Sequence, residues 1–351
     1  MVNQRLHTGR GTAANQKTPE YIVSHEKTFR KNHRRYRKGN AVGVSHSTVS
    51  RALRNDPRIS PETTRKVIQA AYALGYVQNA RPGQPVIGLF LPVKQLDCHV
   101  LCSLSAIATE ILRRNWRFEI LPSSRPNLNP VHFLSGAINI HAPDETIRMW
   151  TLNSIHPLVT YTKRRPLQTG IYPVAEDGFY DMELCVRYLS GLGHRRIGLL
   201  MNHSRQEEES SMEQRYQGFL RAMKPCRLEQ PESYVGFNSD GTLSENLDRL
   251  LAKEITALIV LPGDFCLSVY GELLHRNFRM PSDISLLSWS FPGVLENLYP
   301  RITVLEQNYK QWAEVSCDLL EKKWRGEEVR TPLFVRGKLL KRDSCGPVPC
   351  R

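Results

Sequence analysis

Apolar residues between positions 44 and 76 recur every three or four residues, which is the spacing of amphipathic helices. Ser45 and Ser60 stand where helix N-caps are expected, and Pro61 stands at the first helical position of the second segment. The polar tripeptide 55–57 separates the two segments. The apolar positions of the two predicted helices are Val49, Ala52 and Leu53, then Val67, Ala70, Ala71 and Leu74. The pattern therefore predicts two short helices, each with one buried face.

From Val86 onward, apolar runs that predict buried strands alternate with helical patterns. The predicted strands cover residues 86–92, 117–121, 135–143, 156–161, 170–177, 195–201, 232–237, 256–262 and 283–289. The predicted helices cover residues 103–116, 180–193, 212–224, 245–254 and 265–277. Such alternation is typical of parallel sheets with helices on both faces. Residues 86–345 are too many for one such sheet, so we expect two lobes with a ligand cleft at the carboxyl ends of the strands.

The net charge of +14 is concentrated at the start of the chain. Before Pro85 there are sixteen Lys and Arg residues against four acids. A basic module joined to a nearly neutral body indicates a polyanionic partner, although a solvated, disordered tail also fits part of residues 1–40.

No apolar run is long enough to cross a membrane, and the N-terminus has no apolar segment of a secretory signal. The eight cysteines are scattered, and neither they nor the histidines have the spacing of metal ligands. We therefore expect a cytoplasmic protein with reduced thiols, no cofactor and no metal.

The stretch GVSHSTVSRALRNDPRISPETTRKVIQAAYALGY, residues 43–76, resembles the headpiece of transcription regulators of the lactose- and galactose-repressor family. The likeness continues in the family's order through LSGLGHRRIGLL, RYQGFLRAM, ITALIVLPGDFCLSVYGELLHRNFRMPSDISLLS and YPRITVLEQNYKQWAEVSCDLL. The resemblance implies an α/β protein with an N-terminal helix-turn-helix headpiece and a two-lobed body similar to periplasmic sugar-binding proteins. It also implies a homodimer that binds a double-stranded DNA operator, usually as a repressor, and responds to a small-molecule effector such as a sugar.

This resemblance divides the chain into five segments. The predicted segments are a basic, disordered or out-of-frame segment over 1–41, the headpiece over 42–79, a shortened hinge over 80–85, the two-lobed ligand-binding and dimerisation body over 86–345, and a tail over 346–351.

In the resemblance, HSTVSRAL is the recognition helix, whose N-terminal side chains reach base edges in the major groove. His46 and Ser47 stand at the positions that choose bases. Thr48, Ser50 and Arg51 are suited to phosphates or to a base edge. The predicted DNA-binding residues are Ser45, His46, Ser47, Thr48, Ser50, Arg51 and Asn55.

Two parts of the DNA-binding apparatus depart from the family pattern. The family's first helix reads like T-I-x-D-[VI]-A-x-x-A-G-V-S, whereas this chain has NHRRYRKGNAV before Gly43. Residues 32–39 can be encoded so that a shift of one nucleotide yields T-I-E-D-I-A-K-A, so we hypothesise that residues 1 to about 41 are out of frame. The hinge, NARPGQP, is short, contains two prolines and lacks the leucine that wedges into the minor groove.

The resemblance also assigns ligand-binding positions in the body. Arg215 matches the family's effector-binding arginine, and Asp177 and Asp264 match acids that line the cleft. Trp289 offers an apolar face to a ligand. However, Gly263 stands where many members have Asn, and Ser290 and Phe291 stand where they have Asp.

These observations bear on three candidate functions. The first is a ligand-responsive, dimeric transcription regulator, and the second is a family member that binds small molecules but has lost operator binding through its first helix and hinge. The third, an enzyme, is not expected, because the chain has no G-x-S-x-G, P-loop or H-E-x-x-H motif. A gel shift with the protein's own promoter region separates the first two.

Overall fold

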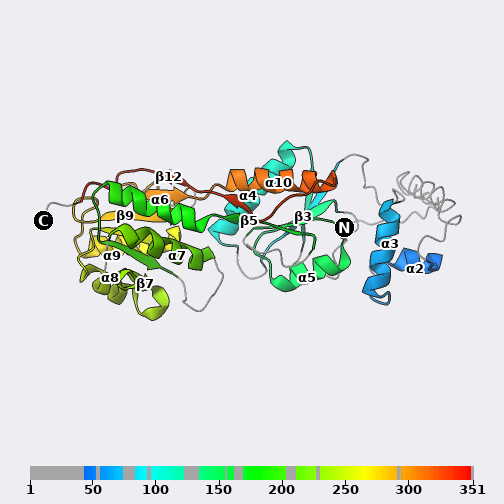
Figure 1. Ribbon diagram of the computed structural model, residues 1–351, viewed down its shortest axis with the longest axis horizontal. Coiled ribbons are helices and arrows are strands. Elements are labelled where there is room, and N and C mark those ends of the chain that lie inside the picture. Colours follow the sequence, from blue (N-terminus) through cyan, green and yellow to red (C-terminus); the bar gives the residue numbers. More distant parts are fainter. Residues whose placement is uncertain are drawn as a thin grey trace, which may run out of the picture. The chain divides into compact units, whose positions relative to one another are not determined.

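A computed structural model shows the headpiece helices and the two lobes of the body (Figure 1). The chain divides into two compact units, Met1–Val77 and Gln78–Arg351. The described residues are 43–52, 56–73, 84–92, 96–121, 134–154, 156–161, 169–202, 211–226, 230–290, 293 and 295–348. The predictions made for residues 1–41, for Leu53, Asn55 and Leu74, and for most of the 80–85 hinge lie outside these ranges.

The first unit contains helices α2 (His46–Ala52) and α3 (Pro61–Ala73). Both predicted N-caps are confirmed, because Ser45 Oγ accepts a hydrogen bond from the Thr48 amide at 3.2 Å and Ser60 Oγ accepts one from the Thr63 amide at 3.2 Å. Ala52 and Val67 are fully buried, whereas Val49 and Ala70 are half-buried, so one position of each predicted apolar face lies in the core of this unit. Both helices are thus capped at their N-termini, and each contributes a buried side chain to the contact between them.

The second unit begins with an N-terminal lobe built on a sheet in which every pair of neighbouring strands is parallel. Its strands, in spatial order, are β11 (Leu333–Val335), β5 (Ile171–Glu176), β4 (Leu158–Thr160), β3 (Gly136–Asn139), β1 (Val86–Phe90) and β2 (Arg117–Leu121). Its helices are α4 (Cys98–Arg113), α5 (Asp144–Asn153) and α10 (Tyr309–Trp324). Helices α4 and α10 pack against each other, as Figure 1 shows.

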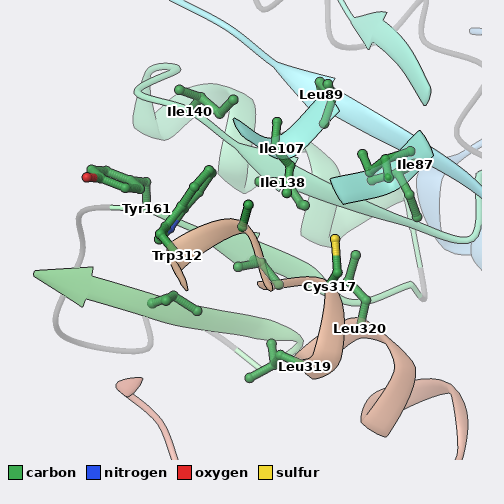
Figure 2. Close-up of a cluster of buried hydrophobic side chains, with 14 of the residues drawn as sticks. Ile87, Leu89, Ile107, Ile138, Ile140, Tyr161, Trp312, Cys317, Leu319 and Leu320 are labelled. Carbon is green, nitrogen blue, oxygen red and sulfur yellow. The ribbon is translucent and has the colours of Figure 1, made fainter. Parts of the chain in front are cut away.

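The core of this lobe joins strand and helix side chains that the sequence places far apart. Ile87 and Ile138, from neighbouring strands, lie in one cluster with Trp312 and Leu320 of α10 (Figure 2). These strands are buried along almost their whole length because helices cover both faces of the sheet. At the surface, Arg114 connects α4 to α10 through a 2.5 Å ion pair with Asp318.

The C-terminal lobe is built on a second sheet. Its strands, in spatial order, are β12 (Lys338–Leu340), β10 (Thr303–Glu306), β9 (Ser285–Ser290), β8 (Ala257–Leu261), β6 (Ile197–Met201) and β7 (Val235–Phe237). Its α-helices are α6 (Gly178–Gly191), α7 (Ser211–Met223), α8 (Leu243–Leu251) and α9 (Gly263–His275). The predicted α/β class with two lobes is therefore confirmed.

Three details differ from the sequence prediction. Strand β12 is antiparallel to β10, because the chain enters it from β11 through only Arg336 and Gly337 and has no crossover helix. The strand predicted over 232–237 is shortened to β7, since Pro231 begins a 3₁₀ helix, Pro231–Tyr234. The third difference is that α5, α10, β10, β11 and β12 were not predicted as separate elements.

The chain passes between the lobes at Asp177, at Gln307–Asn308 and at Arg336–Gly337. Each crossing follows the carboxyl end of a strand, namely β5, β10 or β11. Two of the crossings bond to each other, since Arg336 Nε donates to Asp177 Oδ2 at 3.3 Å. Both carboxylate oxygens of Asp181, in the first turn of α6, also accept from the Gly337 amide, at 2.9 and 3.1 Å. The crossings therefore bring strand ends from both lobes close together.

Candidate functional site

Helix α2 presents its predicted DNA-binding side chains at the surface of the first unit. Ser45, His46, Ser47 and Arg51 are exposed, and Thr48 and Ser50 are half-buried. Ser45 Oγ lies 2.9 Å from Ser47 Oγ and 2.8 Å from Thr48 Oγ1, so the N-terminal turn forms one hydroxyl cluster. Of the predicted set, only Asn55 lies outside the described residues. A capped helix end with exposed polar side chains has the form that major-groove reading requires.

The charges around α2 favour a polyanion. The acids of the described part of this unit are Asp56 and Glu62, and each forms an ion pair, with Arg58 at 2.6 Å and with Lys66 at 2.7 Å. The Arg58 guanidinium lowers the pKa of Asp56 well below its usual range, so this acid is ionised and neutralised. Arg51 therefore adds positive charge to a surface whose described acids are already paired.

A second candidate site joins the two lobes through a buried ion pair. Glu176 ends strand β5 of the N-terminal lobe, and Arg215 lies on α7 of the C-terminal lobe. Arg215 donates to Glu176 Oε2 at 2.5 Å, and Tyr161 donates to Glu176 Oε1 at 2.7 Å. The guanidinium carbon of Arg215 lies 4.0 Å from the centre of the Trp289 ring. Two side chains from each lobe thus form one continuous polar and aromatic contact.

Next to this pair, histidine and tyrosine side chains lie close together at the carboxyl ends of strands in the N-terminal lobe. His99 Nδ1 lies 2.8 Å from both Gln307 Oε1 and Tyr309 Oη, while His99 Nε2 lies 2.8 Å from His141 Nε2. The Tyr161 ring packs within 4.9 Å of the His99 ring and 5.4 Å of the His141 ring, measured between centroids. We call His99, His141, Tyr161, Gln307 and Tyr309 the histidine–tyrosine cluster.

The surroundings shift the pKa values of several groups in this region. Burial alone would raise the pKa of Glu176, but the Arg215 guanidinium and the Tyr161 hydroxyl hold it below its usual value. Burial raises the pKa of Asp181 to about 7. Burial also lowers the pKa of His141 to about 4. The Glu176–Arg215 pair is therefore ionised, whereas the neighbouring histidine is neutral at pH 7.

Several buried donors beside the ion pair have no hydrogen-bond partner among the described residues. They include Arg215 Nε and Trp289 Nε1, and Thr160 Oγ1 at the end of β4 has none either. Arg215 is 6% exposed and Trp289 is 3% exposed, so water at the surface does not satisfy these atoms. Unpaired buried donors at strand ends are suited to bind the oxygen atoms of a ligand.

The structure brings together only part of the predicted ligand set. Arg215 and Trp289 stack directly. Asp177 caps α6 through the Tyr180 amide and contacts Arg336 at 3.3 Å. Asp264 is exposed, and its carboxylate accepts from the Phe265 amide at 2.9 Å. Asp177 is therefore the N-cap of α6, and Asp264 bonds within the first turn of α9.

The start of α9 explains one departure from the family pattern. A Cβ atom added to Gly263 would lie 2.5 Å from Ser290 Oγ and 3.1 Å from Ser290 Cα. The asparagine found here in many family members would therefore collide with strand β9. This part of the family's polar set is replaced by close packing of glycine against serine.

Sequence reasoning missed the whole histidine–tyrosine cluster and the partner of Arg215. His141, Tyr161 and Glu176 each lie at or within two residues of the end of a buried parallel strand, and Gln307 directly follows β10. Polar residues at the carboxyl ends of predicted strands were the signal that could have found them. Among the described residues, no group of three or more His, Cys, Asp and Glu side chains could hold a metal ion.

Comparison with known proteins agrees with this two-part architecture. The model of the lacI family of bacterial regulatory proteins matches residues 40–79, and the model of a periplasmic binding protein-like domain matches residues 186–345. The transcriptional regulator GalS of Salmonella typhimurium is 24% identical over 309 residues, which cover 79% of this chain and 86% of GalS.

Solved structures show the same fold. The lac repressor dimer bound to operator and the anti-inducer ONPF matches with a TM-score of 0.61 and 19% identity, over 87% of this chain and 96% of that one. The complex of the transcriptional regulator CelR with cellobiose matches with a TM-score of 0.60 and 19% identity, over 87% of this chain and 97% of that one. In the described part of the chain, no helix is long and apolar enough to cross a membrane. With its headpiece matched by the lacI model and its body by the periplasmic binding protein-like model, the chain belongs to the LacI/GalR family of bacterial transcription regulators.

Proposed function

We propose that this protein is a repressor that binds a double-stranded DNA operator as a homodimer and responds to a small ligand. The observation that carries this proposal is the presentation of His46, Ser47 and Arg51 on α2, beside acids that are already paired. The exposed helix tip supplies base-reading side chains, and the excess positive charge supplies affinity for phosphates. Since its partner would be chromosomal DNA, we place the protein in the cytoplasm.

Within this proposal, the headpiece covers residues 42–79, the hinge 80–85 and the ligand-binding body 86–345. The DNA-binding residues are those named from the sequence, including Asn55. The ligand would lie where Arg215 and Trp289 meet Glu176, because unpartnered donors gather there. The CelR–cellobiose complex supports a sugar or a related molecule as the ligand, and the lac repressor dimer supports the homodimer.

A gel shift with the full-length protein and fragments of its own upstream region tests the proposal. Wild-type protein should retain one fragment in excess competitor DNA, and the variant His46→Ala/Ser47→Ala should not. Glu183→Gln is a surface control, because Glu183 is exposed on α6 and, among the described residues, forms its ion pair with Arg187 in the i,i+4 arrangement. Light scattering should give a dimer. Retention of every fragment equally, or of none, contradicts the proposal.

The alternative function, a ligand-binding protein without operator binding, is not favoured, because the lacI model matches the headpiece. That match begins at residue 40 and leaves out most of the stretch 32–42 that departs from the family's first helix. We therefore keep the proposal that residues 1 to about 41 are out of frame. Sequencing the gene tests it directly: the neighbouring frame before Gly43 should encode T-I-E-D-I-A-K-A, and any other peptide there refutes it.

A further inference from the structure

The ion pair between the lobes uses both oxygens of a single carboxylate. Glu176 receives the Arg215 guanidinium on Oε2 and the Tyr161 hydroxyl on Oε1. The side chain of Arg215 is 7% exposed and that of Glu176 is 12% exposed. The positive charge of the arginine that the family resemblance assigns to the effector is therefore already neutralised inside the protein, without any ligand.

The acids around this pair also matter for the charge that a ligand can carry. Asp181 is 1% exposed, and Asp177 lies at the adjacent crossing between the lobes. Arg336, the nearby cation, contacts Asp177 and is itself 58% exposed. A ligand carboxylate or phosphate at Arg215 would therefore enter a buried region in which the Glu176 carboxylate already balances the charge of the arginine. Like charges in such a region repel strongly because little water screens them.

The unpaired donors of the site favour an uncharged acceptor group on the ligand. Arg215 Nε and Trp289 Nε1 are donors without partners among the described residues, and the two side chains are stacked at 4.0 Å. A hydroxyl or carbonyl oxygen can accept from these donors without bringing charge. A carboxylate could accept from them too, but only by competing with Glu176 for the same guanidinium.

We propose that Glu176 is the specificity-determining residue that sets the charge class of the ligand: the site admits uncharged molecules with hydroxyl or carbonyl oxygens, and it excludes sugar acids and sugar phosphates. This inference rests on the proposed ligand site at Arg215. Glu176 occupies the anionic position from the N-terminal lobe, so the ligand has to supply only neutral acceptors.

The test uses the full-length protein and small probes of known charge. Thermal unfolding is followed during titration with sulfate and D-gluconate, at constant ionic strength, for wild type, E176Q, E176Q/R215M and the surface control E183Q. E176Q leaves Arg215 without its counter-charge, so it should bind sulfate at least tenfold more tightly than wild type. The double variant should lose that gain, and E183Q should behave like wild type.

A second arm compares neutral sugars with their acids on wild type alone. D-galactose and cellobiose are titrated beside D-galacturonate and cellobionate, and no acid should bind more tightly than its neutral partner. This comparison tests the inference even if E176Q does not fold, because it uses wild-type protein alone. An Arg215-dependent saturation of wild type by sulfate, a wild-type preference for an acid, or a folded E176Q with no gain overturns the inference. Gel shifts on the same wild-type protein keep the outcomes separate, because loss of operator binding contradicts the proposed function but leaves charge selection intact.

Discussion

The Nε2 atoms of His99 and His141 lie 2.8 Å apart, so a single proton can be shared between them. His99 Nδ1 faces Gln307 Oε1, an acceptor, and Tyr309 Oη, whose own proton is donated to Gln307, so Nδ1 carries a proton. His141 must then donate through Nε2 to the bare Nε2 of His99. Both rings are neutral in this arrangement, and a proton added to the bare Nε2 of His99 would break the bond.

The pair predicts a loss of stability in mild acid. Burial lowers the pKa of His141 to about 4 and also lowers that of His99, from an ordinary value of 6.5. As the pH falls below 6.5, His99 and His141 become protonated in the unfolded chain but stay neutral in the folded protein. The stabilisation is therefore complete above pH 6.5 and decreases toward pH 4, by at most about 1.4 kcal/mol per pH unit for each histidine.

His141→Asn tests this effect, because asparagine tolerates the left-handed backbone that His141 adopts at a φ of 58°. Urea unfolding between pH 5 and 7 should show a shallower pH dependence in the variant than in wild type. His275→Asn, an exposed position on α9, should keep the wild-type slope. Equal slopes in wild type and His141→Asn would rule out the pair as a source of acid sensitivity.

Removing Arg215 should destabilise the protein in a pH-dependent way. Arg215→Met leaves Glu176 buried without its cation, which should cost about 3–5 kcal/mol at pH 8. Without Arg215, burial raises the pKa of Glu176, so the cost should shrink as the pH is lowered and the carboxyl takes up a proton. Denaturant unfolding at pH 5 and 8 measures this. In Arg215→Met/Glu176→Gln the pH dependence of the cost should vanish, and its persistence would show that another group causes it.

Two glycines of α9 should respond to alanine with opposite signs. A Cβ on Gly263 meets Ser290 Oγ at 2.5 Å, so Gly263→Ala should destabilise the protein by about 1–3 kcal/mol. Gly271 has nothing within 4 Å of an added Cβ, so Gly271→Ala should stabilise the helix by up to about 1 kcal/mol. Urea midpoints of both variants and wild type provide the comparison. A neutral Gly263→Ala would mean that strand β9 shifts easily at Ser290.

His46 and Arg51 should contribute differently to DNA binding. His46 lies at the exposed tip of α2, whereas Arg51 lies five residues further along, where phosphates are within reach. His46→Ala should relax the choice of one base pair, at a cost of about 1–3 kcal/mol there, and Arg51→Ala should weaken all sequences alike and reduce the salt slope by about one. Binding selections at two salt concentrations measure both effects. An altered preferred sequence in Arg51→Ala alone would reverse the two roles.

The periodicity of apolar residues was sufficient to predict most of the fold. The predicted caps Ser45 and Ser60 and most strands are found in place, because local propensity and burial agree at these positions. The elements after residue 300 were harder to predict from the sequence. Strand β12 spans only Lys338–Leu340 and is paired on one side, so its sequence has neither the length nor the apolar run of a central strand.

The candidate ligand site could be predicted only in part. The resemblance predicted Arg215, and the apolar face of the Trp289 side chain suggested that residue; the structure stacks the two together. The carboxylate that neutralises Arg215 comes from a strand 39 residues earlier in the chain, and no spacing rule connects Glu176 to it. His99 and Gln307, 208 residues apart, pose the same difficulty. Contacts of this kind arise from tertiary packing, and only the polar ends of strands indicate where to look.

The order of the elements along the chain has a consequence for synthesis of the protein. Helix α10 and strand β11 complete the N-terminal lobe, yet the ribosome makes them after nearly all of the C-terminal lobe. Until about residue 335 has emerged, the strands β1–β5 lack Trp312 and Leu320, which fill their core. The lobe that is translated first is thus among the last parts to be finished, and a stop codon near residue 300 would damage the lobe that is farthest from it in the gene.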